Sequence, residues 1–304
     1  MVAQMLERTI TISSIERARA LRYAAWLAWL QSEYHDAAVL GEEGLTLARQ
    51  MNHQEHIAGF LYVLGVAYRD MGNYARAAGL LDEARDLYEK LGDTQHAADM
   101  VRHHGRLAAN QGDYPLASAL LEQAVDLYRE TGSKGGIAHT LLSLGVVRRY
   151  QGNNARAVEL LEKSLALFRE LDATEGKAYA LTGLARVLRL TGQQERALKL
   201  YAESLVLSRD FGIKLAIQGC FYGMASVSAS LGQSERAARL FAAAEVVREG
   251  IAYALPGPDR NEFQDTIGAI RAKIGDTAFT AASAEGRAMT LEQAIEYALA
   301  READ

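Results

Sequence analysis

The sequence predicts an all-α protein: a right-handed α-solenoid of six helix-turn-helix repeats with a 40-residue period, followed by a C-terminal helical cap. Three observations predict it. Only three prolines occur among 304 residues, of which 49% are hydrophobic, and this composition favours helices. The same residue types recur every 40 residues without insertion, as in stacked repeats. Glycines recur where each helix should end.

The repeats emerge when the chain is written in rows of 40 residues starting at Ala18. The twentieth column is then always Ala and the twenty-third always Leu, while the eighth holds only Gly or Ala. Small residues let two helices approach closely, and the leucines extend an apolar stripe of helical period. We expect repeats over residues 18–57, 58–97, 98–137, 138–177, 178–217 and 218–251.

Two turn positions divide each repeat into two helices. The fifteenth column reads Ser32, Gly72, Gly112, Gly152, Gly192 and Gly232. The second position holds Asn52, Gly92, Gly132, Asp172 and Gly212 in the first five repeats. Gly, Asn and Asp tolerate the left-handed backbone conformation that ends a helix, so each unit reads as helix, short turn, helix and longer turn.

The segments outside the repeats have separate signals. Residues 1–17 are predicted to be the remnant of an earlier helix. Residues 252–304 follow a break at Pro256-Gly257-Pro258 and are predicted to form three short helices that cap repeat six, because a solenoid must cover its open end. Thr290 and Gln293 form the capping-box pattern of a last helix, with an apolar face of Leu291, Ala294, Ile295, Ala298 and Leu299.

The second repeat resembles the tetratricopeptide repeat in its order of small and aromatic residues: Gly65, Tyr68, Gly72, Tyr74, Ala77, Leu81 and Ala84. The usual unit is about 34 residues long, and the extra residues here imply longer helices. The usual proline near the end of the repeat is absent, and the tyrosine of the eleventh column survives only as Tyr68.

The tail resembles the segment that follows the repeats in STAND-type signalling ATPases and their LuxR-type relatives. The matching stretches are 275–279, 285–287 and 290–294. In those bacterial regulators an ATPase module precedes the solenoid, and a DNA-binding module sometimes follows it. The resemblance implies that this chain is the sensor or interaction region of a transcriptional regulator, with such flanking modules in a longer parent chain.

Patterns of enzymatic chemistry are missing. The chain has no Gly-x4-Gly-Lys-Ser/Thr phosphate loop, no Gly-x-Ser-x-Gly nucleophile motif and no kinase signature. Ordinary polar histidines are favoured over a metal site at His103, His104 and His139, and Cys220 is expected to be a packing residue. We therefore expect no enzyme activity, no cofactor and no metal, and the single cysteine fits a cytoplasmic location.

The charges divide unevenly between the two helices of the repeats. The first fourteen columns hold nine arginines against two aspartates, whereas the next twenty hold fourteen basic and twenty-one acidic residues. In tetratricopeptide stacks the first helix lines the concave face, so the resemblance implies a basic groove in a chain whose net charge is −5. A solvated face, or pairing with acids of the second helices, is the alternative.

The resemblance also carries the usual groove columns onto particular residues. Arginine suits carboxylates and phosphates, and tyrosine supplies flat apolar contacts. The predicted groove comprises Arg19, Arg22, Trp26, Tyr62, Arg69, Arg102, Arg106, Asn110, His139, Arg149, Tyr150, Tyr179, Arg186, Arg189 and Tyr222. Trp26 and its neighbour Trp29 have a second interpretation, in which they cover a repeat that precedes this chain.

The sequence thus predicts a non-enzymatic binding scaffold. The partner expected is anionic: an acidic peptide, a carboxylate-rich segment of the parent regulator or a small anionic ligand. Neither a membrane nor direct nucleic-acid binding is expected, because the outer face is acidic. A free-standing adaptor that assembles other proteins and a peptide-pheromone receptor remain alternative functions. We expect the central residues Arg106 and Arg149 to be exposed in the groove.

Overall fold

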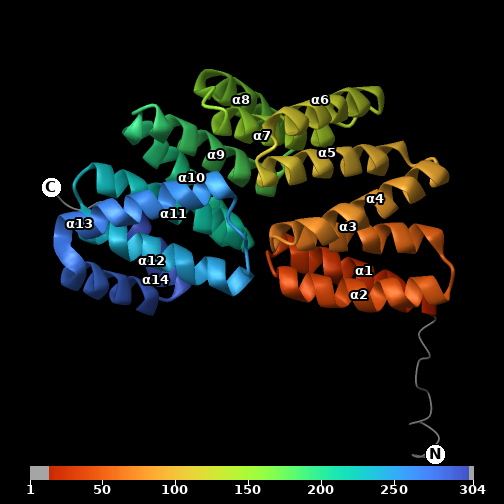
Figure 1. Ribbon diagram of the computed structural model, residues 1–304, viewed down its shortest axis with the longest axis horizontal. Coiled ribbons are helices and arrows are strands. Elements are labelled where there is room, and N and C mark those ends of the chain that lie inside the picture. The colour runs from red at the N-terminus through yellow and green to blue at the C-terminus, as the bar shows by residue number, and fades with distance from the viewer. Residues whose placement is uncertain (1–13, 301–304) are drawn as a thin grey trace, which may run out of the picture.

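The computed structural model of the protein describes residues 14–300, which form helices throughout. Consecutive antiparallel helices stack into a curved solenoid (Figure 1). The helices are α1 (Ser14–Leu30), α2 (Tyr34–Gln50), α3 (Gln54–Asp70), α4 (Tyr74–Leu91), α5 (Thr94–Gln111), α6 (Tyr114–Glu130), α7 (Lys134–Tyr150), α8 (Asn154–Glu170), α9 (Thr174–Leu190), α10 (Gln194–Phe211), α11 (Lys214–Ser230), α12 (Ser234–Ile251), α13 (Gly257–Ala288) and α14 (Leu291–Leu299).

The turns lie where the repeating columns predict them. All six residues of the fifteenth column have positive φ, from 62° at Ser32 to 87° at Gly112. The second turn position is also left-handed in every repeat, with φ of 53° at Asn52 and 50° at Asp172. Only short polar residues replace glycine in the first five of these turns, because longer or branched side chains are strained there.

Small residues allow the two helices of each hairpin to pack closely. A Cβ added to Gly65 on α3 would lie 2.7 Å from side-chain atoms of Leu81 on α4. Gly145 on α7 has the same relationship to Leu161 on α8. The leucine therefore occupies the space that a larger residue would need. The predicted small and Leu columns are where the hairpins interlock.

The C-terminal segment covers the last hairpin. Helix α13 packs on α12 and α11, and α14 packs on α12 and α10. Non-helical backbone at Gly275 (φ 81°) divides α13 in two, which gives three helical segments. The capping box of Thr290 and Gln293 is present, as predicted. Arg236 on α12 donates hydrogen bonds to backbone carbonyls of Tyr297, Ala298 and Ala300, so the end of α14 is held against the last repeat.

The solenoid curves until its two ends touch, and Figure 1 shows the first and last hairpins facing each other. Lys214 Nζ at the start of α11 lies 3.0 Å from Glu33 Oε1 in the first hairpin turn. The backbone N–H of Ala254, after α12, donates to the carbonyl of Asp70 at the end of α3 over 2.9 Å. The concave face is therefore enclosed by the chain itself.

Other expectations concern the N-terminus and membranes. Most of the predicted N-terminal helix remnant, residues 1–13, lies outside the described residues, while residues 14–17 begin α1. Among the described helices, none combines the length and apolar character needed to cross a bilayer.

Candidate functional site

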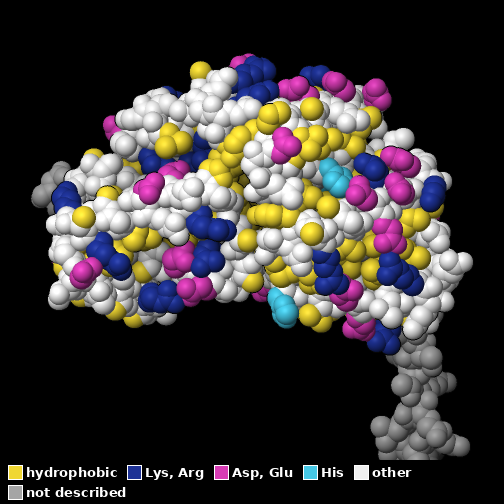
Figure 2. All heavy atoms as spheres, viewed as in Figure 1, with side chains coloured by type: hydrophobic (Ala, Val, Ile, Leu, Met, Phe, Trp, Pro, Cys, Tyr) yellow, Lys and Arg dark blue, Asp and Glu magenta, His cyan; other side chains and the backbone are white. Residues whose placement is uncertain are grey.

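The enclosed concave face contains a cavity of about 420 Å³, which we call the central chamber. The inner helices α3, α5, α7, α9 and α11 supply most of its wall, and it is closed on the C-terminal side by Tyr253, Leu255, Pro256 and Asp259. In the face drawn in Figure 2, hydrophobic side chains gather around the middle and charged ones lie mainly nearer the margin. The volume lies in the lower part of the usual range for ligand pockets, roughly 300–1,000 Å³.

Two of the inner arginines are neutralised by residues of their own helices. Arg69, fully buried, makes a bidentate ion pair with Asp70 at 2.8 and 2.9 Å. Trp29 Nε1 also donates to that carboxylate, over 3.0 Å. Arg102 lies 3.0 Å from Asp99 on α5. These two aspartates are the only acids that the first fourteen columns contain, and both are already used.

Three more inner arginines are neutralised by the C-terminal cap. Asp259 accepts a hydrogen bond of 2.8 Å from Arg149 and one of 2.6 Å from Arg186. Glu262, one turn later on α13, pairs with Arg189. Burial raises the pKa of Asp259, but the attraction of Arg186 and Arg149 outweighs it and holds the pKa at about 2. The cap is thus an anionic segment bound inside the predicted groove.

The expectation that Arg149 is exposed is therefore wrong. Its side chain is 6% exposed, because α13 lies over it. The excess of arginine counted on the first helices does not make an open basic groove, since most of that charge is balanced by Asp70, Asp99, Asp259 and Glu262.

Arg106 on α5 is the exception. Among residues 14–300 no carboxylate lies within ion-pairing distance of it, and its guanidinium has no hydrogen-bond partner. It is half-buried and lines the central chamber. Burial lowers the pKa of Arg106 to about 10, and the neighbouring Arg69 and Arg102 act in the same direction. Even so, Arg106 carries its charge at neutral pH.

Glu175 and Gln218 are further polar groups of the chamber wall that lack partners in the described part of the chain. Glu175, at the start of α9, makes no ion pair. Burial raises the pKa of Glu175, while Arg106 acts against that rise, so the two side chains attract each other without touching. Gln218 on α11 is 3% exposed, and its Nε2 has no acceptor.

Neutral histidines and tyrosines fill the space between the charges. His103 lies between two arginines: its Nδ1 is 2.5 Å from Arg69 Nη1, and its Nε2 is 3.0 Å from both Arg102 Nη2 and Tyr62 Oη. Burial, Arg102 and Arg69 lower the pKa of His103 well below its usual value. Burial, followed by Arg102 and Arg106, lowers the pKa of His139 to about 3. Both rings are uncharged at neutral pH.

Nine of the fifteen predicted groove residues line the chamber: Tyr62, Arg102, Arg106, Asn110, His139, Arg149, Tyr150, Tyr179 and Arg186. The other six lie outside its wall. Arg19 is exposed and Arg22 half-buried on α1, and Trp26 packs edge-on against Trp29 and Tyr62. Arg69 and Arg189 are held by their acids, and Tyr222 is buried in a stack on Phe263 at 4.0 Å.

Several residues of the chamber wall lie outside the repeat columns from which the groove was predicted. Glu175 lies just before the start of its repeat, outside the fourteen columns in which charges were counted. Gln218 occupies the first column, where the other five repeats have Ala, and that departure was a usable signal. Three further residues become part of the chamber wall only because the two ends of the solenoid meet: Tyr34, Tyr253 and Asp259.

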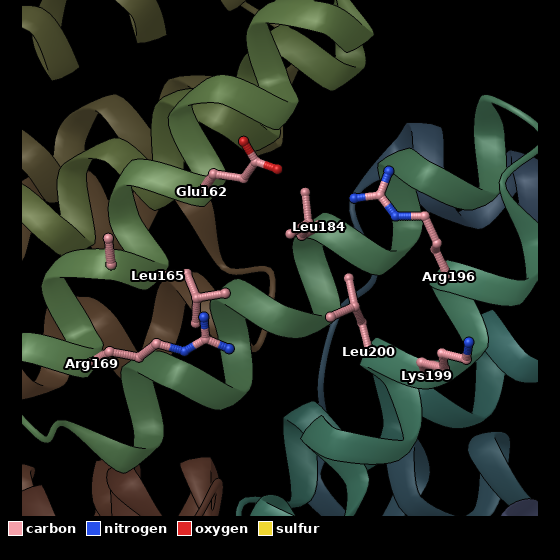
Figure 3. Close-up of a pocket in the computed structure, with 8 residues that line it drawn as sticks. Glu162, Leu165, Arg169, Leu184, Arg196, Lys199 and Leu200 are labelled. Carbon is pink, nitrogen blue, oxygen red and sulfur yellow. The ribbon is translucent and has the colours of Figure 1, made fainter.

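A second hollow, of about 430 Å³, lies between α8 and α10 over α9. Figure 3 shows Leu165, Leu184 and Leu200 at its floor, with basic side chains around it. Those cations have partners: Arg169 bonds to Glu203, Lys199 to Glu195 and Arg196 to Gln193. The one acid of its wall, Glu162, is exposed to solvent, so this hollow lacks the half-buried unpaired charges that distinguish the central chamber.

The residues considered for other chemistry are accounted for within the described range. Residues 14–300 contain no group of three or more His, Cys, Asp and Glu placed to hold a metal ion. Cys220 is fully buried near Thr182, and burial raises the pKa of its thiol to about 11. A thiol in that state is a packing group, because the thiolate is the reactive form.

Comparison with known proteins identifies the repeats. Residues 57–130 and 136–210 match the tetratricopeptide repeat family, so the chain carries tetratricopeptide repeats over these segments. A comparison with curated proteins finds no match.

Solved structures share the fold. The Rap conjugation gene regulator of plasmid pLS20, in complex with a Phr peptide, has a TM-score of 0.64 at 18% identity, covering 95% of this chain and 78% of that chain. NprR in complex with its cognate peptide NprX has a TM-score of 0.59 at 16% identity, covering 71% and 64%. A STAND protein with a tetratricopeptide repeat sensor from Pyrococcus horikoshii has a TM-score of 0.59 at 15% identity, covering 86% and 41%.

Proposed function

We propose that the chain is the non-enzymatic, ligand-binding part of a signalling regulator, and that its ligand is a small anion or the anionic end of a peptide held in the central chamber by Arg106. One observation carries the proposal. The five other inner arginines that reach the groove from α3, α5, α7 and α9 pair with acids of the chain, whereas Arg106 has no partner among the described residues.

The energetics of burial favour this role for Arg106. A charged group held away from water is costly unless it is paired, and here Arg69 and Arg102 add repulsion. An anion in the chamber would relieve both costs. Arginine also binds carboxylate and phosphate through two parallel hydrogen bonds, which are stronger than neutral ones.

The fold relatives support a binding role and a place in regulation. Two of them were solved with peptides, one of these being a gene regulator, and the third is a signal transduction ATPase with a tetratricopeptide repeat sensor. At 15–18% identity these relatives share the fold alone, so the ligand of this chain has to be argued from its own chamber.

The proposal is tested by titrating the purified chain with small carboxylates, phosphorylated metabolites and short acidic peptides. Binding would be detected first by thermal shift and then measured by calorimetry. For the ligands that bind, we expect Arg106→Gln to raise Kd about 10- to 100-fold, which corresponds to the roughly 1.5–3 kcal/mol of a charge-assisted hydrogen bond.

Arg129→Gln is the matched control, because Arg129 is 68% exposed on α6 and pairs only with Asp126 in the turn before it. It should leave Kd unchanged. Ligands whose affinity is indifferent to Arg106→Gln, or a panel in which no anion binds, would overturn the proposal.

A further inference from the structure

Arg106 and Glu175 face the same cavity from different repeats. Arg106 comes from α5 and Glu175 from the first turn of α9, with α7 between these helices in the chain. Arg106 acts to lower the pKa of Glu175, but no ion pair joins them. Among the described residues, the chamber wall thus carries one unpaired cation and one unpaired anion.

We propose that the ligand of the central chamber is a small zwitterion, of the size of an amino acid or dipeptide, whose carboxylate binds Arg106 and whose ammonium binds Glu175. This inference rests on the proposed function and narrows it. A simple anion satisfies Arg106 and leaves Glu175 half-buried without a cation. A ligand with both charges satisfies both, which matters because each unpaired buried charge is costly.

The buried amide of Gln218 supports an oxygen-bearing ligand. Its Nε2 is a donor without an acceptor, although nearly all buried polar groups in proteins are hydrogen-bonded. Gln218 lines the chamber from α11. A carboxylate or peptide carbonyl oxygen of the ligand is the acceptor that this donor lacks.

The other residues of the chamber wall indicate what kind of side chain the ligand carries. Trp29, Tyr62 and Tyr179 contribute aromatic surface, and Leu142, Val146 and Leu215 contribute aliphatic surface. The neighbouring histidines are neutral at physiological pH. Apolar walls with a few convergent polar groups are typical of small-molecule sites, so the side chain should be apolar or aromatic.

The occupied groove argues against a long partner. Asp259 and Glu262 of the cap hold Arg149, Arg186 and Arg189, and the remaining volume is about 420 Å³. An extended acidic peptide would have to displace α13 before reaching those arginines. A small zwitterion uses the two charges that the cap leaves unpaired.

The experiment compares three forms of one probe. The twenty L-amino acids and the dipeptides of leucine, phenylalanine and tyrosine are screened with the purified chain. The strongest binder is then measured by calorimetry in its free form, with its amine acetylated, and with its carboxylate amidated. We expect acetylation and amidation each to weaken binding about 10- to 100-fold, the loss typical of a charge-assisted contact.

Two variants test which residue binds each charged end of the ligand. Glu175→Gln should remove the preference for the free amine while keeping the preference for the free carboxylate, and Arg106→Gln should do the reverse. Glu203→Gln, at an exposed acid on α10, is the control that should change neither.

Three results would contradict the inference. If the acetylated probe binds as tightly as the free one and Glu175→Gln has no effect, the zwitterion is wrong while an Arg106-dependent anion site stands. If no amino acid or dipeptide binds at millimolar concentration but other anions do, the same conclusion follows. If nothing that binds depends on Arg106, the proposed function fails as well.

Discussion

Asp259 Oδ1 accepts a hydrogen bond of 2.8 Å from Arg149 Nη2, although 110 residues separate the two in the chain. The same carboxylate binds Arg186 and the hydroxyl of Tyr150. These four side chains meet where the start of α13 crosses the C-terminal ends of α7 and α9 on the concave face. The contact joins the cap to the middle of the solenoid and closes one side of the central chamber.

Replacing this carboxylate should destabilise the protein. Asp259→Asn keeps the shape of the side chain but removes the carboxylate that bonds directly to Arg149 and Arg186 in a buried site, and leaves Glu262, 3.9 Å from Arg149, as the nearest remaining acid. Breaking a buried ion pair by removing one partner costs about 3–5 kcal/mol. We expect a loss of this size in the free energy of unfolding, measured by urea denaturation followed by circular dichroism.

Asp265→Asn is the control, because Asp265 is exposed on the same helix. It should leave stability within about 0.5 kcal/mol of the wild type. Hydrogen exchange offers a second measurement, in which Asp259→Asn should speed exchange at the Ala254 amide that bonds to Asp70. Unchanged stability in the Asp259 variant would show that the contact contributes nothing to closure.

Removing the cap should expose the apolar end of the last repeat. Phe263 of α13 stacks on Tyr222 and lies edge-on to Phe241, and both partners are buried. A chain ended at Gly250 should therefore melt at a lower temperature and associate, because apolar area is worth about 25 cal/mol per Å². Calorimetry and light scattering would measure these effects; a monomer with unchanged melting would contradict them.

A milder test of the same surface is Phe263→Ala. Truncating a buried phenylalanine costs about 3–5 kcal/mol, and this variant keeps Asp259 and the chain length. If the truncated chain is unstable while Phe263→Ala is not, the loss comes from other contacts of the cap and not from the aromatic contact of Phe263.

The fold was predictable because its information is local and repeated. Gly72 and Gly112 both adopt the left-handed conformation that ends a helix, and this requirement does not depend on the position of the repeat in the solenoid. The alternation of small residues with Leu81 and Leu161 encodes the hairpin contact within about twenty residues. Six repetitions of the same columns leave little room for another interpretation.

The state of the groove was not predictable in the same way. The columns place Arg149 and Arg186 on the inner face correctly, but its closure depends on how far the solenoid curves and on where the cap crosses it. Asp259 and Glu262 lie outside the repeat period, directly after the Pro256-Gly257-Pro258 break. Their three-residue spacing on a helix was the available sign that one face of the cap is acidic.

Two glycines of α7 provide a test of the packing between the two helices of a hairpin. An added Cβ at Gly145 would lie 2.7 Å from Leu161 Cγ, whereas at Gly135 no atom lies within 4 Å. Gly145→Ala should therefore destabilise the protein by about 1–3 kcal/mol through overpacking. Gly135→Ala should be neutral or stabilise it by up to about 1 kcal/mol, because alanine favours helix. Equal effects in urea denaturation would mean that Gly145 is not needed for close approach.

The buried histidines should make stability fall in mild acid. An unfolded histidine takes up a proton below about pH 6.5, whereas His139 in the fold stays neutral down to about pH 3. Between these values the unfolded state binds more protons, so the free energy of unfolding decreases as pH falls, by up to about 1.4 kcal/mol per pH unit for each such group. His103 acts in the same direction, because its pKa is also lowered, whereas the raised pKa of Glu175 opposes the trend. Urea denaturation between pH 7.5 and 5 should show this slope, and His139→Gln should reduce it. A stability that stays constant over this range in the wild type would mean that neither ring is held neutral by the fold.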